Sequence, residues 1–242
     1  MAPDDVSRRL AEVRGSTERL LAALRDPPRD EVYVRRPSLL PGWSRAHVLA
    51  HVARNADAVR RTLEGARRRE PVPMYDSEEQ RAADIEAGSR RDARALVEDV
   101  AASAAGLDEV FTRMRPDDWE AEGVTRAGRM PAWRLIGSRW REVEIHRVDL
   151  DDGYGPGDWP ASFVAPLLPA LIDADRLAPR LPPGTAVDVT DTDSGHRWAI
   201  GPESGRRVAV TGPSWALVAW LTGRPAAVRR ELASPPQLSP WS

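Results

Sequence analysis

Residues 140–150 read WREVEIHRVDL and place Glu142, Glu144 and His146 in a segment whose apolar residues have the pattern of a buried helix face. Buried charges are costly unless they have partners, so these side chains must contact something. Residues four apart lie on the same face of a helix, and Glu144 falls on roughly the opposite side from the other two. The spacing therefore predicts that Glu142 and His146 form a pair.

A second pair with the same spacing, His47 and His51, follows the segment LPGWS, in which Ser44 is well placed to cap a helix. A carboxylate and a histidine from one helix, joined by a histidine from another, are a common metal site in helical bundles. Ligands without sulfur suit zinc better than nickel, iron or manganese, and three protein ligands leave one position open for chemistry. A hydrogen-bonded Glu–His pair without metal is the commoner arrangement, so both interpretations stay open on spacing alone.

Four helical segments are predicted in the first part of the chain. Apolar residues recur at helical spacing over residues 6–24, after Ser44, over residues 77–114 with a break near Gly88 and Ser89, and over residues 131–150. Pro131 is a good first-turn residue for the last of these helices. Four helices of this length predict a bundle.

A change of composition at residues 151–160, DDGYGPGDWP, marks a linker. Beyond it we expect a helical stretch over residues 162–177, three strands and a final helix over residues 214–221. The strand-like runs are TAVDVTD (185–191), HRWAI (196–200) and RRVAVTG (206–212), and DTDSG (191–195) is typical of a hairpin. The sequence thus predicts an α+β protein, with a bundle over residues 1–154 and a small α+β domain with a Pro-rich tail over residues 155–242.

Composition narrows the range of functions. The chain of 242 residues has 35 basic residues, all Arg, against 37 acidic ones, a balance that argues against a nucleic-acid or anionic-membrane surface and favours small molecules. The run RRTLEGARRRE (60–70) is typical of a solvated helix face. The chain has no Cys, which excludes a thiolate ligand or a protein-borne thiol nucleophile and fits a reducing cytoplasm. We expect a cytoplasmic monomer.

Four blocks in a fixed order resemble the mycothiol-dependent maleylpyruvate isomerases. They are LLPGWSRAHVLAHVARNADA (39–58), PVPMYDSEEQRAADIEAGS (71–89), REVEIHRVDL (141–150) and WLTGR (220–224). The first and third blocks also occur more widely among thiol-dependent enzymes that resemble DinB-type bundles, whereas the block that contains PMY occurs in a narrower group of proteins. The resemblance implies a DinB-like four-helix bundle that holds zinc on His51, Glu142 and His146, with His47 not a ligand. It also implies an essential Arg of the second domain, which is Arg224 here, although the residues that follow it are less typical.

The resemblance further implies the reaction. A zinc- and mycothiol-dependent isomerase would convert maleylpyruvate to fumarylpyruvate in gentisate catabolism by thiolate addition, bond rotation and elimination. A chain without Cys would have to import that thiol. The alternative is a mycothiol S-transferase of the same group, which would consume the thiol instead of returning it. A non-enzymatic carrier on the same scaffold is disfavoured because all three ligand positions are intact.

Overall fold

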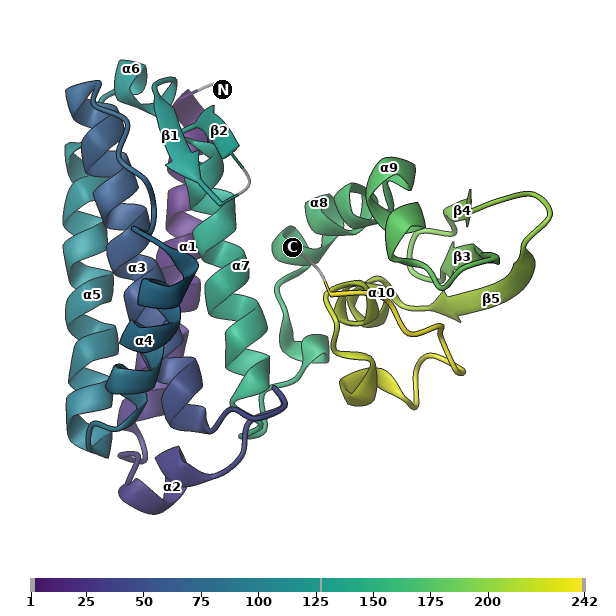
Figure 1. Ribbon diagram of the computed structural model, residues 1–242, viewed down its shortest axis with the longest axis horizontal. Coiled ribbons are helices and arrows are strands. Elements are labelled where there is room, and N and C mark those ends of the chain that lie inside the picture. Colours follow the sequence, from purple (N-terminus) through teal and green to yellow (C-terminus); the bar gives the residue numbers. More distant parts are fainter. Residues whose placement is uncertain (1–2, 127, 241–242) are drawn as a thin grey trace. The chain divides into compact units, whose positions relative to one another are not determined.

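The computed structural model describes residues 3–126 and 128–240, and the chain divides into two compact units, Met1–Asp152 and Gly153–Ser242. The first unit is mainly helical, and the second combines helices with a small sheet (Figure 1). This architecture confirms the predicted α+β class. Among the described residues, no helix combines the length and the apolar character needed to cross a membrane.

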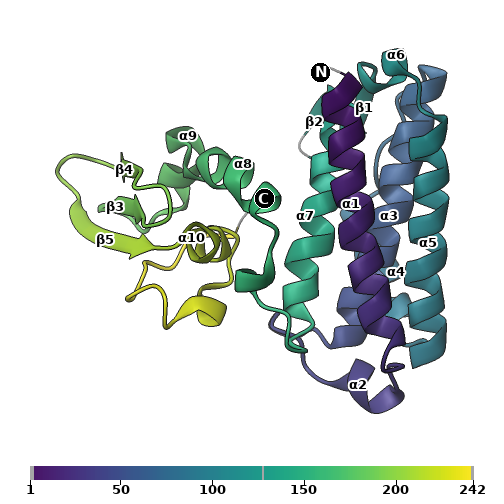
Figure 2. The same ribbon diagram turned by 180° about the vertical axis from the view of Figure 1, so that it is seen from behind.

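Four long helices run side by side in the first unit and form a bundle (Figures 1 and 2). They are α1 (Pro3–Arg25), α3 (Arg45–Arg68), α5 (Ala93–Arg113) and α7 (Arg134–Asp149). Helices α1 and α3 each pack against α5 and α7. Each helix contributes fully buried apolar side chains to the core, such as Leu24, Leu49, Leu96 and Val143. The apolar spacing seen in the sequence is therefore the spacing that closes the bundle.

A shorter helix, α4 (Glu78–Ser89), packs on the outside of α3. Ser77 caps its first turn by accepting a hydrogen bond from the Gln80 backbone N–H at 3.0 Å. Gly88 allows α4 to approach closely, because a Cβ there would stand 2.9 Å from the Ala50 Cβ. The chain then breaks before α5, at the position where the sequence predicts a break. Helix α4 is thereby held beside the part of α3 that carries His51.

The remaining elements of the first unit lie at the ends of the bundle. They are α2 (Glu31–Arg35), α6 (Pro116–Trp119), β1 (Glu122–Thr125) and β2 (Gly128–Pro131). Strands β1 and β2 pair antiparallel, with Glu122 opposite Pro131. The prediction that Pro131 begins the last bundle helix is therefore wrong. Pro131 ends a strand, and the helix begins at Arg134 because the backbone of residues 132 and 133 is still bonded to Ala121 and Trp119.

Within the described residues, the second unit contains a three-stranded sheet and three α-helices. Its helices are α8 (Ala161–Ile172), α9 (Ala174–Leu177) and α10 (Ser214–Leu221), and its strands are β3 (Thr185–Asp191), β4 (Arg197–Ile200) and β5 (Arg206–Gly212). The strand order is β4-β3-β5. Strand β4 pairs antiparallel with β3, as the hairpin residues predict, and β5 pairs parallel with β3. Helix α10 packs against α8 and β5 and is almost entirely buried, which explains its apolar sequence.

Candidate metal centre

Three side chains from two bundle helices converge on one point. The Nε2 atom of His51 on α3 lies 2.8 Å from the Glu142 Oε2 atom and 2.9 Å from the Nε2 atom of His146, both on α7. The Nε2 atom of His146 lies 3.2 Å from the same Glu142 oxygen. The side chain of His51 is 5% exposed and that of Glu142 is 28% exposed. The triad is thus buried at His51 and accessible to solvent at the Glu142 carboxylate.

The surroundings favour the protonation states that a metal ion needs at two of these positions. Burial, followed by the charge of His146, lowers the pKa of His51 to about 4, so this imidazole is neutral at neutral pH. Burial alone would raise the pKa of Glu142, but hydrogen bonds from His146 and His51 outweigh it and hold that pKa well below the ordinary value. The centre therefore offers an ionised carboxylate beside a neutral imidazole.

The donor set fits a zinc ion. Two ligands each about 2.1 Å from a tetrahedral zinc ion lie on the order of 3.4 Å apart, close to the 2.8–3.2 Å separations seen among the three atoms. Hydrogen bonding accounts for the arrangement less well, because a single proton on one Nε2 atom cannot serve all three contacts with good geometry. One cation satisfies the two lone pairs and the carboxylate together. His51, Glu142 and His146 are the residues that would hold it.

Asp149 orients one of these rings. Its Oδ2 atom lies 2.8 Å from the Nδ1 atom of His146, and the Asp149 side chain is fully buried. Burial would lower the pKa of His146, but hydrogen bonds to Asp149 and Glu142 outweigh it and raise that pKa. A carboxylate on Nδ1 holds the imidazole in the tautomer that directs the Nε2 lone pair at a metal, and it raises the basicity of the ligand.

We expect Asp149→Asn to bind zinc about 10- to 100-fold more weakly than the parent protein, because the amide lacks the charge that orients and activates His146. Competition against a chromophoric chelator measures this affinity. Glu144→Gln is the matched control, since Glu144 is a buried carboxylate on the same helix that accepts from Ser16 and pairs with Arg19 on α1. An unchanged affinity in Asp149→Asn would contradict the orienting role.

Arg81 of α4 borders the centre, and sequence reasoning did not single it out. Its Nη2 atom lies 3.3 Å from the Nδ1 atom of His51, and its guanidinium carbon is 5.5 Å from the ring centroid of Tyr75. A guanidinium only donates, so His51 accepts at Nδ1 in this contact. Cation binding at Nε2 would move the ring proton to Nδ1 and end the contact. Arg81 would then be available to another acceptor. The only sequence signal for it is its place in the block that contains PMY.

A layer of buried polar groups lies one helical turn from the triad. Arg139 of α7 is 1% exposed and donates through Nη1 to the Val52 carbonyl at 2.8 Å and to the Asn55 Oδ1 atom at 2.9 Å. Burial lowers the pKa of Arg139 to about 10, so it remains a cation at neutral pH. Asn55 is 4% exposed and stands four residues after His51 on α3. This buried guanidinium therefore places a positive charge about one helical turn from the triad.

The other residues considered from sequence lie elsewhere. Glu144 faces α1, away from the triad, as its helical phase predicts. His47 contacts Ser44 through Nδ1 and Glu86 through Nε2, at the start of α3. His196 is exposed in the β3–β4 hairpin. Arg224 belongs to the second unit, just after α10, where its backbone N–H donates to the Ala219 carbonyl at 2.7 Å and its guanidinium donates to the Thr222 carbonyl.

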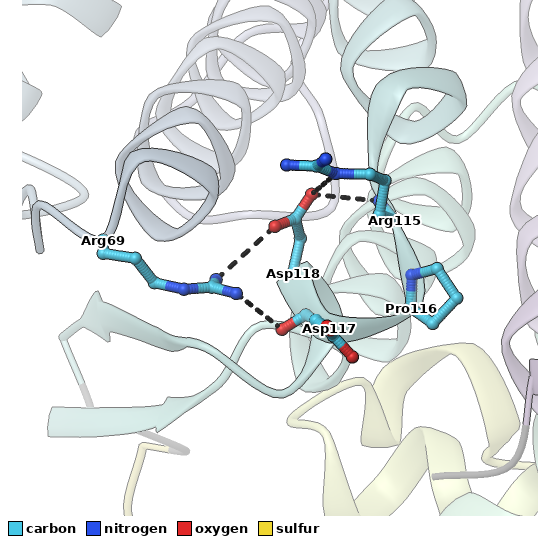
Figure 3. Close-up of a pocket in the computed structure, with 5 residues that line it drawn as sticks. All are labelled: Arg69, Arg115, Pro116, Asp117 and Asp118. Atoms are coloured by element: carbon cyan, nitrogen blue, oxygen red, sulfur yellow. Dashed lines mark hydrogen bonds and ion pairs between the residues drawn. The ribbon is translucent and has the colours of Figure 1, made fainter.

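A separate surface pocket lies where α3 ends, and it is lined by Arg69, Arg115, Pro116, Asp117 and Asp118 (Figure 3). Arg69 is 18 residues from His51 along α3, a distance of about 27 Å. Arg69 pairs with the Asp118 carboxylate at 3.5 Å, and that carboxylate also accepts from the Arg115 backbone N–H at 3.0 Å. These charges compensate one another and cap the start of α6. We therefore interpret the pocket as a structural feature and the triad as the candidate functional site.

Comparison with known proteins identifies the family of the first unit. Residues 13–151 match the family model described as the mycothiol maleylpyruvate isomerase N-terminal domain. A crystal structure of a histidine-to-alanine mutant of the mycothiol-dependent maleylpyruvate isomerase is 29% identical, with a TM-score of 0.86. Another structure of that isomerase is 30% identical, with a TM-score of 0.84. Each alignment covers 98% of this chain and 97% of the other chain. No curated protein matches.

Proposed function

The chain belongs to the mycothiol maleylpyruvate isomerase family, and from this membership we propose that it converts maleylpyruvate to fumarylpyruvate with mycothiol as thiol cosubstrate. We assign the reaction to gentisate catabolism in the cytoplasm. The observation that carries the proposal is the convergence of His51, Glu142 and His146 within a family whose described members depend on a thiol. That convergence supplies a place where a thiol can be ionised.

The reaction explains why the chain needs an external thiol. Cis–trans conversion of a double bond conjugated to a carbonyl requires the bond to become single for long enough to rotate. Addition of a thiolate to one alkene carbon achieves this, because the π electrons move to the carbonyl oxygen and form an enolate. Return of those electrons expels the thiolate and restores the double bond. The chain has no Cys, so it cannot supply the nucleophile itself.

We infer that the triad holds zinc, which when bound supplies positive charge that favours the ionised form of a nearby thiol. The residues of the chain have separate roles around it. His51 and Glu142 present a neutral and an anionic donor, and Asp149 orients His146. In the second unit, Arg224 would bind a carboxylate or the enolate oxygen of the substrate, because its planar fork of donors suits such groups.

A spectrophotometric assay of maleylpyruvate with and without mycothiol tests the proposal. We expect no turnover by the zinc-loaded protein alone, and full conversion of a large excess of substrate when a catalytic amount of mycothiol is added. An S-transferase would instead stop once the thiol had been consumed, which a titration of free thiol detects. Turnover in a dialysed, thiol-free sample would contradict the mechanism, and no turnover with mycothiol would contradict the substrate.

A further inference from the structure

Arg81 lies on the face of α4 that packs against the bundle. It stands one helical turn before Ile85, so the two side chains share a face. Ile85 is buried in the bundle core, and Gly88 on the same face allows α4 to approach Ala50 of α3 closely. Arg81 is itself half-buried, and its Nη2 atom lies 3.3 Å from the Nδ1 atom of His51. The guanidinium is therefore directed toward the metal centre.

The guanidinium of Arg81 has no carboxylate partner within the part of the chain that the structure describes. Its printed contacts are a hydrogen bond to a ring nitrogen of His51 and an approach of 5.5 Å to the ring centroid of Tyr75. Four carboxylates near it in sequence are bonded to other groups, Asp76 to Arg61, Glu78 to Arg126, Asp84 to Gln80, and Glu86 to His47 and Arg90. A half-buried cation is costly when no anion faces it. The chain thus presents, beside the metal centre, a positive charge that suits an anionic ligand.

The contacts of Arg81 hold it in place and leave donors available. A guanidinium has more N–H donors than the one bond to His51 uses. The Tyr75 ring lies within cation–π distance of it. Tyr75 follows Met74, whose side chain is buried and whose backbone N–H donates to the Val124 carbonyl at 3.1 Å, so this support is anchored. The remaining donors can bind a planar anion through two parallel hydrogen bonds.

We propose that Arg81 binds a carboxylate of the substrate, namely the one on the alkene carbon that the thiolate attacks. The inference rests on the proposed isomerase function. Mycothiol has no carboxylate, so the substrate must supply the anion. In maleylpyruvate the thiolate adds at the position β to the ketone, and that carbon carries one of the two carboxylates. A thiol ionised at the triad therefore brings this carboxylate to the group that borders His51. The other carboxylate is at the pyruvate end of the substrate.

We expect Arg81→Ala to raise KM for maleylpyruvate about 10- to 100-fold, the usual loss for a charge-assisted hydrogen bond. The value of kcat should change little, because the carboxylate is bound alike before and during thiolate addition. Arg81→Lys should recover only part of the affinity, since an ammonium group lacks the planar fork. Arg90→Ala is the matched control, because Arg90 directly follows α4 and pairs with Glu86 at the surface. An unchanged KM in Arg81→Ala would overturn the assignment.

Two probes with one carboxylate each identify the end of the substrate that Arg81 binds. The trans isomer of acetylacrylate keeps the alkene, the ketone and the carboxylate on the alkene, whereas acetylpyruvate keeps only the pyruvate end. In calorimetric titration of the zinc-loaded, thiol-free protein, the dissociation constant for acetylacrylate should rise about tenfold in Arg81→Ala. That for acetylpyruvate should not change, and methyl acetylacrylate, which has no charge, should bind both proteins equally. No binding of acetylacrylate by the parent protein, or weakening of acetylpyruvate or the ester instead, would overturn the assignment.

Zinc affinity separates carboxylate binding from a purely structural role. If Arg81 only held the His51 ring in place, Arg81→Ala would bind zinc more weakly, and acetylacrylate and its ester would lose affinity alike. We expect instead that competition against a chromophoric chelator gives the parent zinc affinity. A parent protein that binds acetylacrylate through Arg81 but does not turn over maleylpyruvate would refute the substrate assignment alone. Turnover of maleylpyruvate with the same KM in Arg81→Ala would refute this inference alone.

Discussion

Replacing His51 by alanine is expected to remove the metal from the purified protein and to lower kcat by roughly three orders of magnitude or more. The reason is that, within the part of the chain that the structure describes, three side chains converge at the centre. The loss of one leaves two ligands for an ion whose charge is worth several kcal/mol to the reaction. Glu142→Ala and His146→Ala should behave in the same way. Elemental analysis of each variant, with its kinetics, measures both effects.

His47→Ala is the matched control for His51→Ala. His47 has the same side chain and lies one turn earlier on α3, but its contacts are with Ser44 and Glu86. We expect this variant to keep its zinc and most of its activity, with a modest loss of stability from the weakened start of α3. Stoichiometric zinc in all three triad variants would exclude the triad as the metal centre.

Replacing Arg224 by alanine is expected to lower kcat by about two to three orders of magnitude, the usual loss on removal of one oxyanion donor, without loss of zinc. Arg224→Lys should recover little of this activity, because an ammonium group cannot reproduce the bidentate fork. Arg229→Ala is the matched control, since Arg229 is an exposed guanidinium in the same unit. Steady-state kinetics with the zinc content checked in parallel measure the effect.

The competing interpretation of Arg224 is purely structural. Its guanidinium donates to the Thr222 carbonyl beyond the end of α10, where a cation is favourable to the helix dipole. On that interpretation, Arg224→Ala would lose at most about 1 kcal/mol of stability and keep near-normal rates. A kcat within a few-fold of the parent value would therefore remove Arg224 from the active site.

Local sequence patterns determined most of the secondary structure. The apolar spacing that predicts the bundle helices, and the alternation in TAVDVTD and RRVAVTG, recur in α1, α3, α5, α7, β3 and β5. These patterns can be recognised in the sequence because the residues that face the core recur at the period of the helix or strand itself. The prediction for Pro131 is wrong because it used local sequence alone. Proline suits a first helical turn, but the pairing of Pro131 with Glu122 depends on a second strand that local spacing does not show.

The sequence by itself also determined which faces of the last bundle helix carry Glu142, His146 and Glu144, because helical phase depends only on spacing. Helical spacing left open whether a histidine of the second helix meets the first two, and only the resemblance implied that His51 does. The tertiary structure places His51 beside them, bonds Asp149 to the far side of His146 and brings Arg81 to the ring of His51. These contacts join helices and loops distant in the chain. No periodic pattern encodes them, because each depends on how whole elements pack.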